Sequence, residues 1–140
     1  MTTPLANAAP LGLHAFPGKG RGIIALADLA ADAVLDVAAT VALDGQACAL
    51  LEQTPAGQYY FAHPADPDQG LLVLGLPSLL NHSDTPNVTV AWSHDPALGW
   101  LAITKTLRPV RKGEELTRQY ACPPWFAVAG EPLRLHRRRL

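Results

Sequence analysis

Apolar and polar residues alternate most clearly in the second half of the chain. In residues 88–92 every second residue is large and apolar, and the residues between them are small or polar, which places the large side chains on one face of a strand. Residues 94–99 are turn formers, and residues 100–104 return as an apolar partner strand. The pattern therefore predicts a β-hairpin in this part of the chain.

Shorter apolar segments predict further strands. Residues 23–26 and 34–43 are rich in aliphatic side chains, and residues 59–61 are aromatic, as is typical of strands. Only residues 47–53 favour a short helix. We expect residues 1–16 to form an irregular lead-in. The chain is therefore predicted to be mostly β, with several short strands and little helix.

Composition favours the same class. A length of 140 residues is that of one domain with a modest core. The chain contains 13 prolines and 11 glycines, which argue for many short elements separated by turns and against a helical bundle.

The formal net charge of −1 is unevenly distributed. Residues 1–133 carry a net charge of −5, and the remaining four basic residues are Arg134, Arg137, Arg138 and Arg139. Such a terminus is typical of a solvated tail. Four arginines without aromatic neighbours or a basic body are weak support for a nucleic-acid arm, so no nucleic-acid partner is expected. The acidic body favours basic, lysine-bearing substrates instead.

Several features predict a cytoplasmic location. Cys48 and Cys122 form no CxxC pattern and have no histidine at zinc-finger spacing, so two buried free thiols in a reducing compartment and no metal site are expected. Residues 1–4 lack the features of a signal peptide. The most apolar stretch, residues 70–80, is too short to span a bilayer, so no membrane partner is expected.

Three segments are candidates for chemistry. Residues 18–22 have glycine at every second position, which lets the backbone approach a ligand closely, but no parallel βαβ alternation follows, so a dinucleotide-binding fold is excluded. Residues 81–87 place amides, an imidazole and hydroxyls directly after an apolar run, and residues 113–120 form a turn and a strand that end in Tyr120. Each segment alone also fits an ordinary turn or strand.

Together, the order and spacing of these segments resemble one family, the SET-domain protein lysine methyltransferases. Residues 18–25 resemble the opening glycine turn and strand of the family, and residues 29–34 resemble the step that follows. Residues 81–87 match its N-H-S-x-x-P-N signature, and residues 107–120 resemble its closing motif. The resemblance covers roughly residues 17–120, and the last two motifs are specific.

The resemblance implies a SET-domain fold of several small sheets, with a C-terminal pseudoknot, over residues 17–126. Residues 127–140 would form a C-terminal segment with the basic tail. The resemblance also implies S-adenosylmethionine as the methyl donor, S-adenosylhomocysteine as the product, and a lysine-containing protein or peptide as the substrate. Short members of the family can dimerise to complete the substrate groove, so a homodimer is one expectation.

By the same resemblance, each cofactor-binding residue has an expected role. The backbone near Lys19, Gly20 and Arg21 would hold the methionine end. Asn81 and His82 would contact the cofactor, and Tyr120 would lie at the methyl-transfer channel as the catalytic residue. Trp125 has a flat face suited to stacking on the adenine or forming one wall of the channel, although capping of the core fits it equally well. The predicted cofactor-binding residues are Lys19, Gly20, Arg21, Asn81, His82, Tyr120 and Trp125.

These residue types fit the chemistry of methyl transfer. The reaction is an in-line displacement, so the enzyme mainly has to align the amine, the methyl group and the sulfur, and to desolvate the amine. A lysine of pKa about 10.4 must first lose a proton, and an apolar channel beside a cationic sulfonium lowers that pKa. The Tyr120 hydroxyl can orient the neutral amine.

The chain departs from the family pattern at several positions. Gln119 replaces an acidic residue, and Arg118 stands where many members have an aromatic residue that limits the number of methyl groups added, so mono-, di- and trimethylation stay open. Tyr59 or Tyr60 is a candidate second channel tyrosine, with sheet packing as the other interpretation. The zinc-binding cysteine segment that follows the closing motif in many members is absent. A catalytically silent module that binds cofactor or a protein partner is the alternative function.

Overall fold

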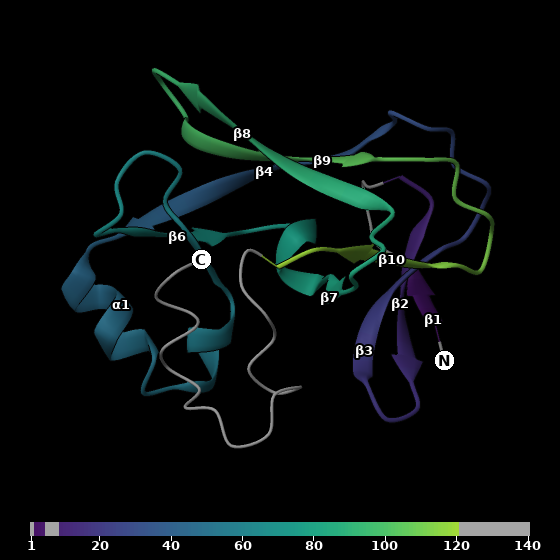
Figure 1. Cartoon of the computed structure of the whole chain (residues 1–140), viewed down its shortest axis with the longest axis horizontal. Helices are drawn as coiled ribbons and strands as arrows, with labels where there is room; N and C mark the ends of the chain where they lie inside the picture. The colour runs from purple at the N-terminus through teal and green to yellow at the C-terminus, as the bar shows by residue number, and fades with distance from the viewer. Residues whose placement is uncertain (1, 5–8, 121–140) are drawn as a thin grey trace.

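The computed structural model describes residues 2–4 and 9–120 (Figure 1), with side chains from residue 9 onward. Two five-stranded sheets dominate it. In chain order the elements are β1 (Thr2–Pro4), β2 (Leu11–Phe16), β3 (Gly20–Ala25), β4 (Val34–Leu43), α1 (Gly45–Leu51), η1 (Pro55–Gln58), β5 (Tyr60–Ala62), β6 (Gly70–Val73), η2 (Leu76–Leu79), β7 (Asn81–His82), β8 (Val88–Asp95), β9 (Gly99–Thr106) and β10 (Glu115–Arg118). The mostly-β class with little helix is confirmed.

The first sheet has the strand order β1-β2-β3-β10-β7. β10 comes last among the described strands, yet it lies between β3, to which it is antiparallel, and β7, to which it is parallel. The segment after β7 also bonds to β10, because the N–H of Ser83 donates to the carbonyl of Arg118 (3.0 Å) and that of Asn87 to the carbonyl of Thr117 (3.2 Å). This insertion of a late strand between two earlier ones is what the predicted pseudoknot fold requires.

The second sheet has the order β5-β6-β4-β9-β8 and contains the predicted hairpin. β8 and β9 pair antiparallel from Val88 opposite Thr106 to Asp95 opposite Gly99, and they run along the top of the molecule in Figure 1. The Asp95 carboxylate closes the turn by accepting from the N–H groups of Ala97 and Leu98 (both 2.8 Å).

The main core lies between the two sheets and fixes β10. Its buried side chains come from β2, β3, β4, η2, β8, β10 and the loops between them; they are Leu11, Ile23, Ala25, Leu29, Leu35, Leu76, Leu80, Val88, Val110 and Leu116. Leu116 of β10 is fully buried. Burial of apolar surface on this scale is the main stabilising contribution to such a domain, and here it also positions the strand that leads to Tyr120.

Two local predictions were wrong. Residues 1–16 are not an irregular lead-in, because β1 and β2 lie there and β2 pairs with β3 along its whole length, from Leu11 opposite Ala25 to Phe16 opposite Gly20. The polar segment that begins at residue 81 is not only a turn, because its first two residues form β7 beside β10. β2 pairs with the next strand of the chain, whereas β7 depends on β10, a partner distant in sequence. In the described part of the chain, no helix has the length and apolarity needed to cross a membrane.

Candidate active site

Tyr120 follows β10 and is held by His82 of β7 and by Leu80, the residue just before β7. Its N–H donates to Nδ1 of His82 (3.0 Å), and its hydroxyl donates to the carbonyl of Leu80 (3.2 Å). The His82 and Tyr120 rings also pack with their centroids 5.1 Å apart. The start of the polar segment at residues 81–87 and the closing tyrosine are therefore brought together.

The environment of Tyr120 keeps its hydroxyl protonated. Burial raises the pKa of Tyr120 above its usual value of 10.0, and the cationic Arg118 opposes this shift without reversing it. Tyr59 and Glu115 lie close enough to add to the rise, because a negative charge on either disfavours ionisation of the Tyr120 hydroxyl. A protonated hydroxyl that donates to Leu80 still has lone pairs that can accept a hydrogen bond.

The two candidates for a second tyrosine differ in what they contact. The Tyr60 side chain is buried, and its hydroxyl donates to Oε2 of Glu52 (2.5 Å). The Tyr59 hydroxyl instead accepts from Nη2 of Arg21 (3.4 Å), and Tyr59 acts on the ionisation of Tyr120. Tyr59 is therefore the tyrosine next to the predicted site, whereas the hydroxyl of Tyr60 bonds to Glu52.

Glu115 organises the other end of the site. Its Oε1 pairs with Nζ of Lys19 (2.5 Å), and its Oε2 accepts from Nδ2 of Asn81 (2.7 Å). The same Nδ2 donates to the carbonyl of Arg21 (3.2 Å). Lys19 and Asn81, which the sequence proposed as cofactor contacts, thus share one carboxylate that the sequence did not single out. Arg21 joins them through its backbone carbonyl.

Two glycines shape this end of the site in different ways. A Cβ at Gly22 would lie 2.7 Å from both Nδ2 of Asn81 and Oε2 of Glu115, so only glycine leaves room for that pair. Gly20 has a φ of +80° and no atom within 4 Å of where its Cβ would be. Its backbone is therefore open to a ligand, in a conformation that L side chains rarely adopt.

The polar groups at this end fit the amino-acid end of a methionine-derived cofactor. Such a group has one carboxylate and one ammonium. Lys19 and Arg21 are cations suited to the carboxylate. Glu115 is an acceptor suited to the ammonium, and so is Oδ1 of Asn81, which accepts no hydrogen bond from the residues that the structure describes.

Other predicted positions lie farther from this cluster or outside the described residues. The Arg118 guanidinium lies between the rings of Phe61 and Tyr120, and Gln119 is exposed. Cys48 is buried, as expected. Trp125, Cys122 and the basic tail lie outside the described residues, so their predicted roles stay predictions. Nowhere in residues 9–120 do three or more His, Cys, Asp or Glu side chains gather as metal ligands would.

Comparison with known proteins identifies the family. The family model for the SET domain matches residues 20–121. A histone-lysine N-methyltransferase of Schizosaccharomyces pombe, specific for H3 lysine-37, is 29% identical over an alignment of 123 residues, and the alignment covers 84% of this chain and 78% of that protein.

Solved structures share the fold. A candidate histone methyltransferase of Plasmodium falciparum superposes with a TM-score of 0.62 and 22% identity, over 84% of this chain and 96% of that one. A humanized Chaetomium thermophilum Polycomb Repressive Complex 2 bound to the inhibitor GSK126 gives a TM-score of 0.67 and 15% identity, over 81% of this chain and 15% of that one.

The fold and the site together define a SET domain. This chain belongs to the SET-domain family, and its enzyme class is protein-lysine methyltransferase. The resemblance stated from the sequence is confirmed.

Proposed function

We propose that the protein is an S-adenosylmethionine-dependent methyltransferase that methylates the side-chain amine of a lysine in a protein or peptide. One observation carries the proposal: a cluster of charged and polar side chains and the Tyr120 hydroxyl meet at the paired strands β7 and β10. Asn81 and Glu115 gather charged and polar groups, while the Tyr120 hydroxyl is held on the carbonyl of Leu80, the residue just before Asn81.

This arrangement supports assigned roles for the residues. The cofactor, when bound, supplies a methyl group on a cationic sulfur. Lys19, Arg21, Asn81 and Glu115 would hold its charged end, with the open backbone of Gly20 alongside. The oxygen of Tyr120 would accept a hydrogen bond from the substrate amine and so direct the nitrogen lone pair toward the methyl group, which is a matter of alignment and not of covalent chemistry.

Removing the side chains of Asn81 or His82 is expected to weaken cofactor affinity. Asn81→Ala deletes the amide that bridges Arg21 and Glu115, and His82→Ala deletes the acceptor for the Tyr120 N–H. Loss of such contacts costs about 1–3 kcal/mol each. Calorimetric titration with S-adenosylmethionine measures this, with Gln53→Ala, an exposed amide on the α1 side of the molecule, as the control. Wild-type affinity in both variants would contradict the assignment.

The rate of methyl transfer is expected to rise with pH. Well below the lysine pKa of about 10.4, each pH unit increases the neutral amine about tenfold. Tyr120 does not oppose this rise, because burial raises its pKa above 10.0 and its hydroxyl stays protonated throughout the range. The measurement is kcat/KM between about pH 7 and 9.5, with circular dichroism at each pH to verify the fold. A decrease that begins below about pH 9 would show that another group controls the rate.

A catalytically silent module is the second candidate, and the cation of Arg118 beside Tyr120 is the observation that favours it. Incubating the full chain with radiolabelled S-adenosylmethionine and a lysate of its source organism, followed by mass spectrometry of labelled bands, separates the two. Labelled lysine that appears only when the folded protein is added supports the methyltransferase. Tight cofactor binding without label on any protein supports the silent module.

A further inference from the structure

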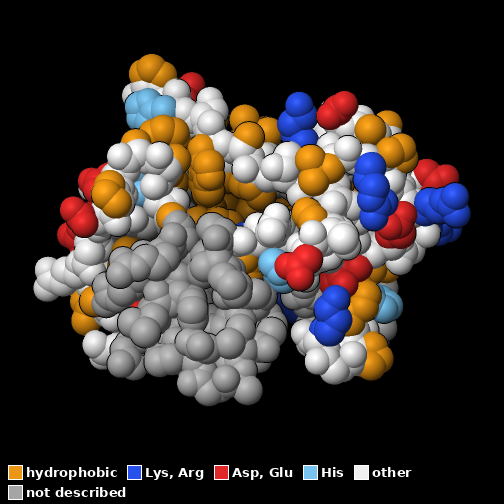
Figure 2. Space-filling model, viewed as in Figure 1, with side chains coloured by type: hydrophobic (Ala, Val, Ile, Leu, Met, Phe, Trp, Pro, Cys, Tyr) orange, Lys and Arg blue, Asp and Glu red, His pale blue; other side chains and the backbone are white. Residues whose placement is uncertain are grey.

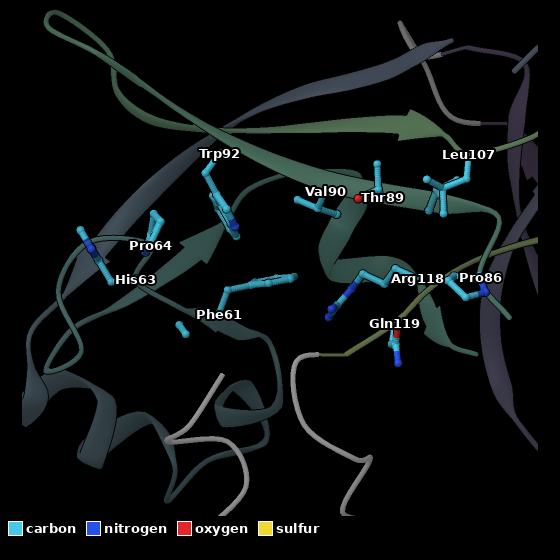
Figure 3. A pocket seen from close by; sticks show the side chains of 12 residues that line it. Phe61, His63, Pro64, Pro86, Thr89, Val90, Trp92, Leu107, Arg118 and Gln119 are labelled. Carbon is cyan, nitrogen blue, oxygen red and sulfur yellow. The ribbon is translucent and has the colours of Figure 1, made fainter. Parts of the chain in front are cut away.

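Arg118 occupies an unusual position for a cation. Its guanidinium carbon lies 4.3 Å from the centroid of the Phe61 ring and 4.2 Å from that of Tyr120, and its Nε donates to the carbonyl of Pro77 (3.2 Å). Figure 3 shows the side chain reaching from β10 toward Phe61. Two rings and one carbonyl fix the guanidinium in place, so it is pre-organised for a further contact.

Arg118 faces a cavity of about 490 Å³. Phe61 of β5 and Val90 and Trp92 of β8 supply apolar walls, and Gln119 adds a polar group. Figure 2 shows the same region as a hollow lined by apolar side chains below β8. A cavity of this size, with apolar walls and one fixed charge, is the kind of site that binds a side chain or small ligand.

No carboxylate neutralises Arg118 within residues 9–120. The ion pairs there are Lys19–Glu115, His82–Asp84 and Arg108–Glu114. Burial lowers the pKa of Arg118 to about 10, which reports the cost of placing a charge in this environment. An anion that entered the cavity would offset that cost, whereas a neutral group would not.

We propose that Arg118 binds the carboxylate of a glutamate or aspartate side chain of the substrate peptide, and that this contact selects the methylated lysine. The proposal rests on the proposed function, because it places the peptide beside Tyr120. The guanidinium that lines the cavity lies 4.2 Å from the centroid of the Tyr120 ring, and an extended residue spans about 3.3–3.6 Å. The acidic residue would therefore lie within about three residues of the target lysine.

The chemistry of the cavity favours a carboxylate. One guanidinium matches one carboxylate through paired hydrogen bonds, and the apolar walls suit the methylene groups of a glutamate. The body of the protein is acidic and attracts basic peptides at long range. Arg118 would add a preference for an acidic residue near the target lysine, which the net charge of the protein does not predict.

Paired peptides test the proposal. Lysine peptides carry glutamate or glutamine at each position from three before to three after the lysine, and kcat/KM is measured with the full chain. Wild type is expected to prefer glutamate about tenfold at one position or more, as for a charge-assisted hydrogen bond. The ratio is expected to fall to about one in Arg118→Met and to an intermediate value in Arg118→Lys. Because the ratio compares two peptides on one variant, a general loss of activity cancels.

A matched control and a second readout separate the possible failures. Arg111→Met removes an exposed arginine outside the cavity and is expected to keep the wild-type ratio. Fluorescence anisotropy of labelled peptides reports binding without turnover. Preferential binding of glutamate peptides with no methylation supports Arg118 and overturns the proposed function. Methylation with equal rates for both peptides, or a glutamate preference that survives in Arg118→Met, overturns the Arg118 site.

The source of the carboxylate is also testable. Peptides that end shortly after the lysine are compared as free acids and as amides, both without acidic side chains. Equal rates support recognition of a side chain. A preference for the free acid that Arg118→Met removes would overturn the side-chain assignment in favour of a chain terminus.

Discussion

Replacing Tyr120 with phenylalanine is expected to reduce methyl transfer at least a hundredfold and to leave cofactor affinity within about twofold. The hydroxyl is the part of Tyr120 placed to accept from the substrate amine, because its own proton is donated to the carbonyl of Leu80. Deleting one pre-organised polar group at a reacting centre typically costs about 10²–10³ in rate. The ring remains, so its packing against His82 and Arg118 is retained.

The measurement combines single-turnover methylation at saturating cofactor with calorimetry of cofactor binding. Loss of one hydrogen bond to Leu80 costs about 1 kcal/mol of stability, so the variant should remain folded. Tyr60→Phe is the matched control, because the Tyr60 hydroxyl bonds to Glu52. A wild-type rate in Tyr120→Phe would remove the catalytic role, and an equal loss in Tyr60→Phe would point to stability instead.

Periodicity predicted much of the fold because some strands carry their own signal. The β8–β9 hairpin alternates in residue type and has turn formers between its strands, so local information suffices. β2 was missed because Gly12 and Ala15 weaken its pattern, and the strand is stabilised by pairing with β3. β7 has only two residues, and they form a strand because they pair with β10.

The candidate site was predicted in part for a similar reason. Family motifs named Lys19, Asn81 and Tyr120, and the structure brings their segments together. Glu115 lay inside the closing motif without an assigned role, because its importance comes from a partner 96 residues away, Lys19. Arg118 was noticed as a departure from the family pattern, but its place between two rings depends on β5 and β10 meeting.

Asn87, the last residue of the N-H-S-x-x-P-N signature, has a structural role. Its side chain is almost completely buried, with 2% exposed. Nδ2 donates to the carbonyl of Glu115 (2.8 Å), and Oδ1 accepts from the N–H of Thr117 (2.9 Å). One amide thereby satisfies a donor and an acceptor on β10, the strand that carries Glu115 at its start and leads to Tyr120 at its end.

Replacing Asn87 with alanine is therefore expected to lower the free energy of unfolding by about 2–5 kcal/mol. Two buried backbone groups of β10 would lose their partners, and each unsatisfied group costs about 1–3 kcal/mol. Urea denaturation followed by circular dichroism measures the change. Thr85→Ala, an exposed position in the same loop, is the control and should change stability by less than about 0.5 kcal/mol.

Asn87→Asp makes the test more specific. Aspartate keeps an acceptor for Thr117 but loses the donor to Glu115 and brings in a charge, so it should be at least as destabilising as alanine. Equal stability in wild type and Asn87→Ala would show that β10 is held by the core and its strand partners alone. If the prediction holds, Asn87→Ala and Tyr120→Phe lose activity for different reasons. Asn87→Ala loses activity together with stability because β10 is released, whereas Tyr120→Phe loses activity in a folded protein.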